Sequence, residues 1–204
     1  MPELNDGDCY GFERNSAGDF PFYRQPPNAL SGRSWVLILL GVVLGFTVLT
    51  AHIGFYKTTV GGFVPAILFP LIPLAVLAMV AGKAWRSLFR TPTGRDVLLM
   101  LAIAGVNILV SVAVALVLQH LFKMSENPVN AMLAEASNTA RILFYVKTAP
   151  QLFGEEVVSI LPFLAILWVC HTKLSLSRKS AIITAWLCTA LIFGAMHLPT
   201  YDWN

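Results

Sequence analysis

The sequence predicts an all-α protein, a polytopic membrane helix bundle with about five transmembrane helices. Hydrophobic residues make up 56% of the 204 residues and charged residues only 12%, whereas an average soluble domain carries about 25% charged residues. This composition argues against a soluble enzyme, a disordered scaffold and a secreted disulfide mini-protein. Five apolar segments of about 20 residues match a hydrocarbon core about 30 Å thick, because a helix rises about 1.5 Å per residue.

The N-terminal part of the chain differs in composition from everything after it. Residues 1–34 are rich in Gly, Pro, Asn, Asp and Ser and show no apolar periodicity. We therefore expect a disordered polar tail at 1–34. The transmembrane helical domain is expected to cover residues 35–204.

The five spans are justified by apolar runs of membrane-crossing length. We expect them at about 35–56, 60–81, 97–118, 152–170 and 181–198. Three prolines in the second span (Pro65, Pro70 and Pro73) predict a kink but do not prevent a membrane span. The connection 119–150 is predicted to be a loop partly folded on the membrane surface, in which 137–147 could form an amphipathic interfacial helix.

The basic residues predict the orientation and the partners. Ten Lys and Arg residues fall on the side of the tail and four on the opposite side, so the tail is predicted to be cytoplasmic. They form no continuous basic stripe, which argues against nucleic acid as a partner. The expected partner is the lipid bilayer, and the expected location is the cell membrane, crossed several times.

Ionisable residues inside the spans are few, and they indicate where chemistry could occur. They are His52, Glu155, Glu156 and His197. A carboxylate in hydrocarbon costs at least about 2.5 kcal/mol on insertion scales, so Glu155 and Glu156 need an explanation. Either both lie in the hydrated headgroup region, or at least one faces the helix bundle, because adjacent helical residues point about 100° apart.

The positions of Glu155 and His197 along the chain predict a similar membrane depth. Glu155 lies 20 residues before Ser175, the midpoint of the connection between the last two spans, and His197 lies 22 residues after it. In an antiparallel helix pair this difference corresponds to about 3 Å. A carboxylate can act as a general base toward water, and an imidazole can orient that water or bind a metal.

Two local sequences resemble the motifs of one family. The segment FGEEVVSILPF at 153–163 resembles the first motif, EExxxR, of the CPBP intramembrane proteases, the CAAX-protease and bacteriocin-processing family. The segment IFGAMHLP at 192–199 resembles the second motif, FxxxH, through Phe193 and His197. The combination of a double glutamate opening one span with FxxxH closing the next is more specific than either motif alone.

The resemblance implies a membrane metalloendopeptidase, a hydrolase that cleaves peptide bonds of prenylated protein tails or small peptides near the bilayer. It implies that Glu155 is the catalytic base, that Glu156 is its neighbour in the motif and that His197 orients water or binds metal. The resemblance leaves two mechanisms open. In one, His197 and Glu155 hold a zinc ion; in the other, Glu155 activates water without a metal. One histidine and one or two carboxylates make an incomplete zinc shell.

The sequence departs from the family pattern at two points. Ile160 occupies the position of the motif arginine, and Ser159 beside it is expected to supply a hydrogen bond instead. The family's third motif, a second histidine with an Asn or Asp, is absent up to Asn204. We therefore expect a chain truncated before that motif or a degenerate member, and little activity from these residues alone.

Two other functions stay open beside the protease. The first alternative is a non-catalytic membrane scaffold or bacteriocin-immunity-like protein that lacks the third motif. The second is a small transporter subunit that uses Glu155 or Glu156 as a proton or cation site. The few polar residues in the first three spans argue against transport.

Overall fold

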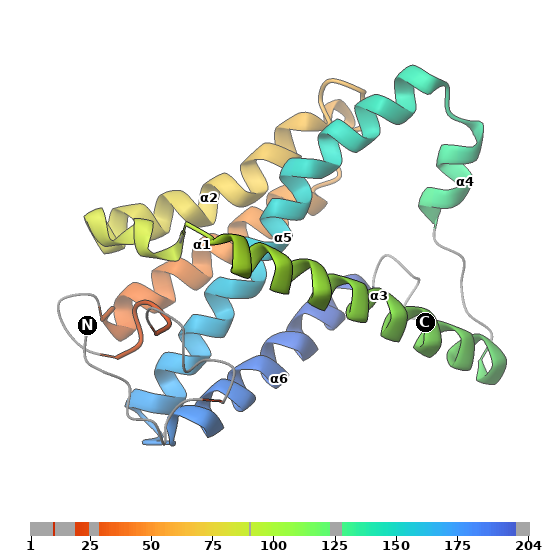
Figure 1. Ribbon diagram of the computed structural model, residues 1–204. Coiled ribbons are helices and arrows are strands. Elements are labelled where there is room, and N and C mark those ends of the chain that lie inside the picture. Colours follow the sequence, from red (N-terminus) through yellow and green to blue (C-terminus); the bar gives the residue numbers. More distant parts are fainter. Residues whose placement is uncertain (1–9, 11–18, 25–28, 90, 123–127, 199–204) are drawn as a thin grey trace. The chain divides into compact units, whose positions relative to one another are not determined.

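The computed structural model describes residues 10, 19–24, 29–89, 91–122 and 128–198 (Figure 1). Over these residues the chain is helical without a strand, which confirms the all-α prediction. The elements are α1 (Gly32–Thr50), η3 (Gly54–Lys57), α2 (Phe63–Ala81), η4 (Gly82–Leu88), α3 (Gly94–Leu121), α4 (Pro128–Glu135), α5 (Asn138–Thr172) and α6 (Arg178–His197). Helices α1, α2, α3, α5 and α6 are each long and apolar enough to cross a membrane.

The chain divides into two compact units. The first consists of Met1–Ser87 and Ser137–Met196, and the second of Leu88–Ala136 and His197–Asn204. The second unit contains α3, which begins with a capping box: the Thr93 hydroxyl accepts from the Asp96 N–H, and the Asp96 carboxylate accepts from the Thr93 N–H. Within the described residues α3 has no buried side chain, so hydrocarbon is the environment that suits its apolar surface.

Helices α1 and α2 pack closely because glycines lie at their interface. Gly41 and Gly45 form a GxxxG pattern on the buried face of α1. A Cβ on Gly45 would lie 2.7 Å from the main-chain oxygen of Phe69, and one on Gly41 would lie 2.9 Å from Cγ2 of Val76. Small residues at this spacing allow two helix backbones to approach in a membrane, where dispersion forces and not water hold helices together.

Phe69 of α2 fills the junction of α1, α2 and α5. Its side chain is 1% exposed, and its ring lies 6.4 Å from that of Phe46 on α1. On the α5 side the ring lies against Gly154, where an added Cβ would be 2.7 Å from its Cε1. Gly154 is therefore the position that lets α5 contact α2 at this level.

The contacts at the helix ends give the direction of each helix in the first unit. Gly62 at the start of α2 lies near Lys147 in the first part of α5, so α2 and α5 run in the same direction. Gly32 at the start of α1 lies near Trp168 close to the end of α5, so α1 runs in the opposite direction. The alternation of spans in the predicted topology requires these directions.

Helix α5 is longer than the span predicted for it. It begins at Asn138, where the Ser137 hydroxyl accepts from the Ala140 N–H, and it continues through Pro150 to Thr172. Its 35 residues correspond to a length of about 52 Å, which exceeds the hydrocarbon core. The segment 138–150, predicted as a surface loop with an interfacial helix, is thus the first part of one continuous helix.

An ion pair joins the polar tail to the start of α6. Nε and Nη2 of Arg178 both donate to Oδ1 of Asp19, at 3.0 and 2.9 Å, and the guanidinium lies over the ring of Phe20. The hydroxyl of Tyr23 donates to the other oxygen of Asp19 at 2.6 Å. The Arg178 side chain is 2% exposed, so this pair is buried at the cationic end.

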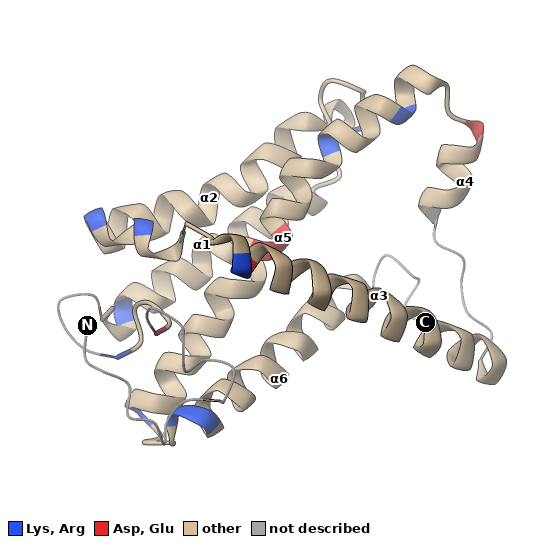
Figure 2. Cartoon of the chain, viewed as in Figure 1, with Lys and Arg blue, Asp and Glu red and all other residues tan. Residues whose placement is uncertain are grey.

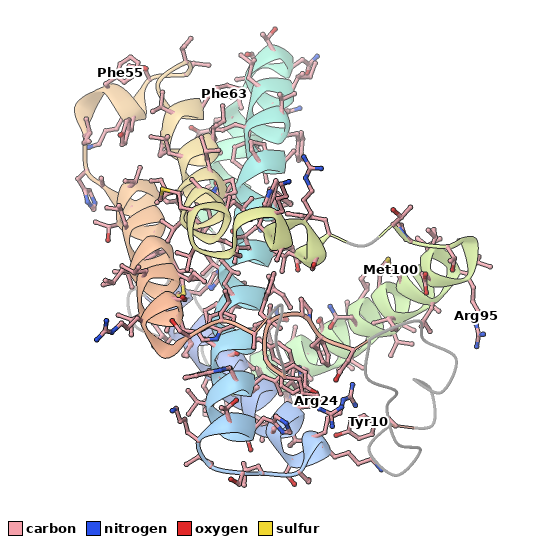
Figure 3. All side chains as sticks on the ribbon, turned by 90° about the vertical axis from the view of Figure 1, so that its left-hand side faces the viewer. Tyr10, Arg24, Phe55, Phe63, Arg95 and Met100 are labelled. Atoms are coloured by element: carbon pink, nitrogen blue, oxygen red, sulfur yellow. The ribbon has the colours of Figure 1, made fainter. Side chains whose placement is uncertain are left out.

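The rest of the tail segment 19–24 packs on the end of α5. Tyr23 is fully buried against the ring of His171, and the Thr172 hydroxyl donates to the Tyr23 carbonyl. Tyr10, labelled with Arg24 in Figure 3, donates to the main-chain oxygen of Lys179 at 3.2 Å. Residues 19–24 are therefore packed, in contrast to the disordered tail that composition predicts, because their partners lie far along the chain.

Candidate functional site

The acidic pair Glu155–Glu156 lies at the middle of α5 (Figure 2). Glu155 follows Lys147 by eight residues and precedes Lys173 by 18, which places it about 12 Å from the first lysine along the helix axis and about 27 Å from the second. Between these two basic residues α5 carries no other Lys, Arg or Asp. This position, well inside the apolar stretch, favours a carboxylate pair within the membrane over one in the headgroup region.

A polar row on α5 surrounds Glu155. The Gln151 amide donates to Oε1 of Glu155 at 3.4 Å, one turn before it. The Ser159 hydroxyl, one turn after it, donates to the main-chain oxygen of Glu155 at 2.8 Å. Ser159 thus bonds the backbone and not the carboxylate, as serine commonly does inside a helix, which corrects the expectation that it replaces the missing arginine.

Gln151 is the residue that sequence reasoning missed. Its spacing of four residues before Glu155 is the signal that could have identified it, because side chains at i and i+4 meet on a helix surface. The amide holds one carboxylate oxygen and supplies no charge. Ile160, at the position of the motif arginine, is half-buried and apolar.

The two glutamates differ in exposure because α5 packs through an adjacent face. Gly154, Val157 and Val158 are buried toward the other helices of the first unit. Glu155 borders this face and is half-buried, whereas Glu156 is exposed. Among the described residues neither carboxylate has an ion pair. Glu155 therefore combines a sheltered position with an oxygen, Oε2, that can take a water.

His197 is the last residue of α6 and is half-buried. The connection before α6 contains Ser175 in a left-handed conformation with φ of 51°, at the position predicted for the reversal of the chain. The buried residues of α6 end at Thr189, two turns before His197. Because His197 belongs to the second compact unit, its predicted approach to Glu155 stays a prediction.

The donor set decides whether a zinc ion fits. A catalytic zinc site uses three protein ligands and an open position. Among the described residues no group of three or more His, Cys, Asp or Glu side chains is close enough to hold a metal. Glu155 and His197, the ligands implied by the resemblance, are two, one fewer than such a shell needs, whereas a carboxylate that activates water needs no metal.

The fold and the site define a class of protein: a multi-pass α-helical membrane protein with a carboxylate pair in one of its membrane-crossing helices. No protein-family model, curated protein or solved structure matches the chain. The resemblance to the CPBP proteases therefore depends on the two motifs at 153–163 and 192–199.

Proposed function

We propose that the protein is an intramembrane endopeptidase of the CPBP type in the cell membrane, which cleaves prenylated protein tails or small peptides. The observation that carries this proposal is the position of Glu155: half-buried in the middle of α5, held at one oxygen by an uncharged amide. Such a carboxylate is suited to take a proton from water in a site that excludes most solvent.

The proposed reaction uses the two oxygens of Glu155 differently. The Gln151 amide donates to Oε1, which leaves Oε2 as the atom that accepts a proton from the attacking water. The hydroxide adds to the peptide carbonyl carbon, the C–N bond breaks, and the proton passes from Glu155 to the leaving amine. In this proposal His197 orients the water, and the exposed Glu156 borders the entry of the substrate.

The test is cleavage of membrane peptides by purified protein in liposomes. Glu155→Gln should lower the rate by about 10² to 10⁴, and His197→Ala by a similar factor, whereas the double variant should be little worse than either single one because residues acting as a unit do not add. Glu135→Gln on α4, an exposed glutamate outside the site, is the matched control. Undiminished cleavage by Glu155→Gln would exclude this mechanism.

A second candidate is the non-catalytic membrane scaffold. One observation favours it: the buried residues of α6 end at Thr189, so among the described residues the FxxxH segment contributes no fully buried side chain. A scaffold would keep its cellular effect in Glu155→Gln and lose it when helix packing is disturbed, for instance at Gly154. If the protein is a protease, Glu155→Gln should abolish the cellular effect.

A further inference from the structure

A hollow lies where α2 leaves the apolar part of the structure and continues as η4. Its volume is about 310 Å³, and it is lined by Ala78, Gly82, Lys83, Trp85 and Arg86. The hollow combines an apolar floor, an indole and two cations. Figure 2 shows the basic residues of η4 in blue at this end of the long uncharged α2.

Gly82 creates the hollow by turning the chain. Its φ of 54° and ψ of −136° lie in a region that residues with a Cβ rarely adopt. No atom lies within 4 Å of the place where a Cβ would be, so the backbone conformation and not lack of space requires glycine here. The turn ends α2 and starts η4, which folds its side chains beside the last turn of α2.

The 3₁₀ geometry of η4 brings the two cations to one face. A 3₁₀ helix has three residues per turn, so side chains at i and i+3 are eclipsed. Lys83 and Arg86 have this spacing, line the same hollow and are both exposed. Within the described part of the chain neither has an ion pair. Their charges are therefore available to an anion from outside the chain.

The place of the hollow along the chain indicates the source of that anion. α2 is apolar throughout its 19 residues, so its end lies at the boundary between hydrocarbon and water. Trp85 in the hollow is of the residue type that prefers this boundary. Charge counting predicts that this end faces the cytoplasm, where the membrane surface carries anionic lipids.

We propose that this hollow binds the phosphate headgroup of an anionic phospholipid. Arg86 can hold two phosphate oxygens with its planar fork, and Lys83 adds a compact charge beside it. Trp85 and Ala78 contact the glycerol and the first carbons of the acyl chains. The volume of about 310 Å³ suits a headgroup, whereas a whole lipid needs the surrounding bilayer for its chains.

The experiment measures retention of labelled phosphatidylglycerol by the full chain in nanodiscs of neutral phosphatidylcholine. Lys83→Gln and Arg86→Gln should each weaken retention about fivefold, and the double variant about 25-fold. Lys57→Gln is the matched control, because Lys57 also lies in an exposed 3₁₀ helix, η3, at the other end of α2. It should change retention by less than twofold.

Competition with inorganic phosphate distinguishes a lipid headgroup from a free phosphate ion as the ligand of the hollow. Phosphate at millimolar concentration should not displace the labelled lipid, because the free ion lacks the apolar contacts. Displacement would mean that the hollow takes a free phosphate and would overturn the lipid proposal. Equal losses in Lys57→Gln and Arg86→Gln would also overturn it, since they would indicate attraction to the whole surface.

Arg86→Lys keeps the test decisive if the glutamine variants fold poorly. It retains the charge but loses the bidentate fork, so retention should fall less than in Arg86→Gln while still falling below that of the unchanged protein. Retention by Arg86→Lys equal to that of the unchanged protein would refute a headgroup held by the Arg86 fork at η4.

Discussion

Replacing Gly45 by alanine adds one carbon atom and should lower the free energy of unfolding markedly. The added Cβ would lie 2.7 Å from the main-chain oxygen of Phe69 and 3.2 Å from Cδ of Pro73. A main-chain atom inside a helix cannot turn away as a side chain can, so α1 and α2 must separate. Inserting one carbon into a packed interface costs about 1 to 3 kcal/mol, and the upper part of that range applies here.

Gly194 provides the matched control for this prediction. It lies inside α6, and no atom is within 4 Å of the place where its Cβ would be. Alanine there should stabilise by about 0.5 to 1 kcal/mol, because alanine has the higher helix propensity. The two alanine substitutions should thus differ by roughly 2 to 4 kcal/mol and have opposite signs.

The assay is unfolding by dodecyl sulfate in mixed micelles, followed by tryptophan fluorescence, to which the buried Trp35 of α1 contributes. A double-mutant cycle with Phe69→Ala identifies the cause. An alanine at position 154 would press against the Phe69 ring, so Gly154→Ala should lower the free energy of unfolding less when Phe69 is already alanine. An alanine at position 45 would press against the Phe69 carbonyl oxygen, which Phe69→Ala keeps, so the loss caused by Gly45→Ala should stay the same. Equal effects of alanine at Gly45 and Gly194 would refute the close α1–α2 packing.

Three further predictions concern the tail and a helix cap. Asp19→Asn should lower the free energy of unfolding by about 3 kcal/mol, because it removes the negative charge that pairs with the buried Arg178 guanidinium, whereas Arg24→Gln at the more exposed end should cost about 0.5 kcal/mol in the same denaturation assay. Burial raises the pKa of Tyr23 and its hydrogen bond to Asp19 raises it further. As the pH rises, the unfolded chain loses the Tyr23 proton at a lower pH than the folded protein does. The stability due to Tyr23 should therefore be complete below a pH of about 10 and decline above it. In an absorbance titration, the phenolate of Tyr23 should appear at a higher pH in the folded protein than in the unfolded chain. Thr93→Ala removes the α3 cap and should speed hydrogen exchange of the first turn, corresponding to about 1 kcal/mol; unchanged exchange would mean that the cap is not formed in solution.

The sequence predicted the spans well and their ends less well. Apolar runs identify the five helices within the described residues that are long and apolar enough to cross a membrane, since hydrocarbon imposes one length and one composition. The predicted connection 119–150 is wrong over 138–150, because Pro150 lies inside α5 and a neighbouring helix can support a proline inside a membrane helix. The opposite error occurred in α1, where apolar residues continue beyond the helix end at Thr50.

The candidate site was predictable only as far as local patterns extend. A glutamate pair in an apolar run is visible in any hydropathy count, and the spacing of Gln151 was available beside it. The hydrogen bond of Ser159 to the backbone depends on a rotamer, which no pattern specifies. The burial of Tyr23 depends on His171, nearly 150 residues away, and no periodicity connects the two.

The bond between Asp19 and Arg178 also has a consequence for how the protein is made. The two residues are 159 positions apart, so at about 5 to 20 residues per second a ribosome produces Arg178 roughly 8 to 30 s after Asp19. The spans before α6 therefore enter the membrane before the contact between Asp19 and Arg178 can form. A nascent chain stalled before residue 178 lacks the contact, so the tail can close on α6 only after synthesis has passed α5 and reached the first residue of α6.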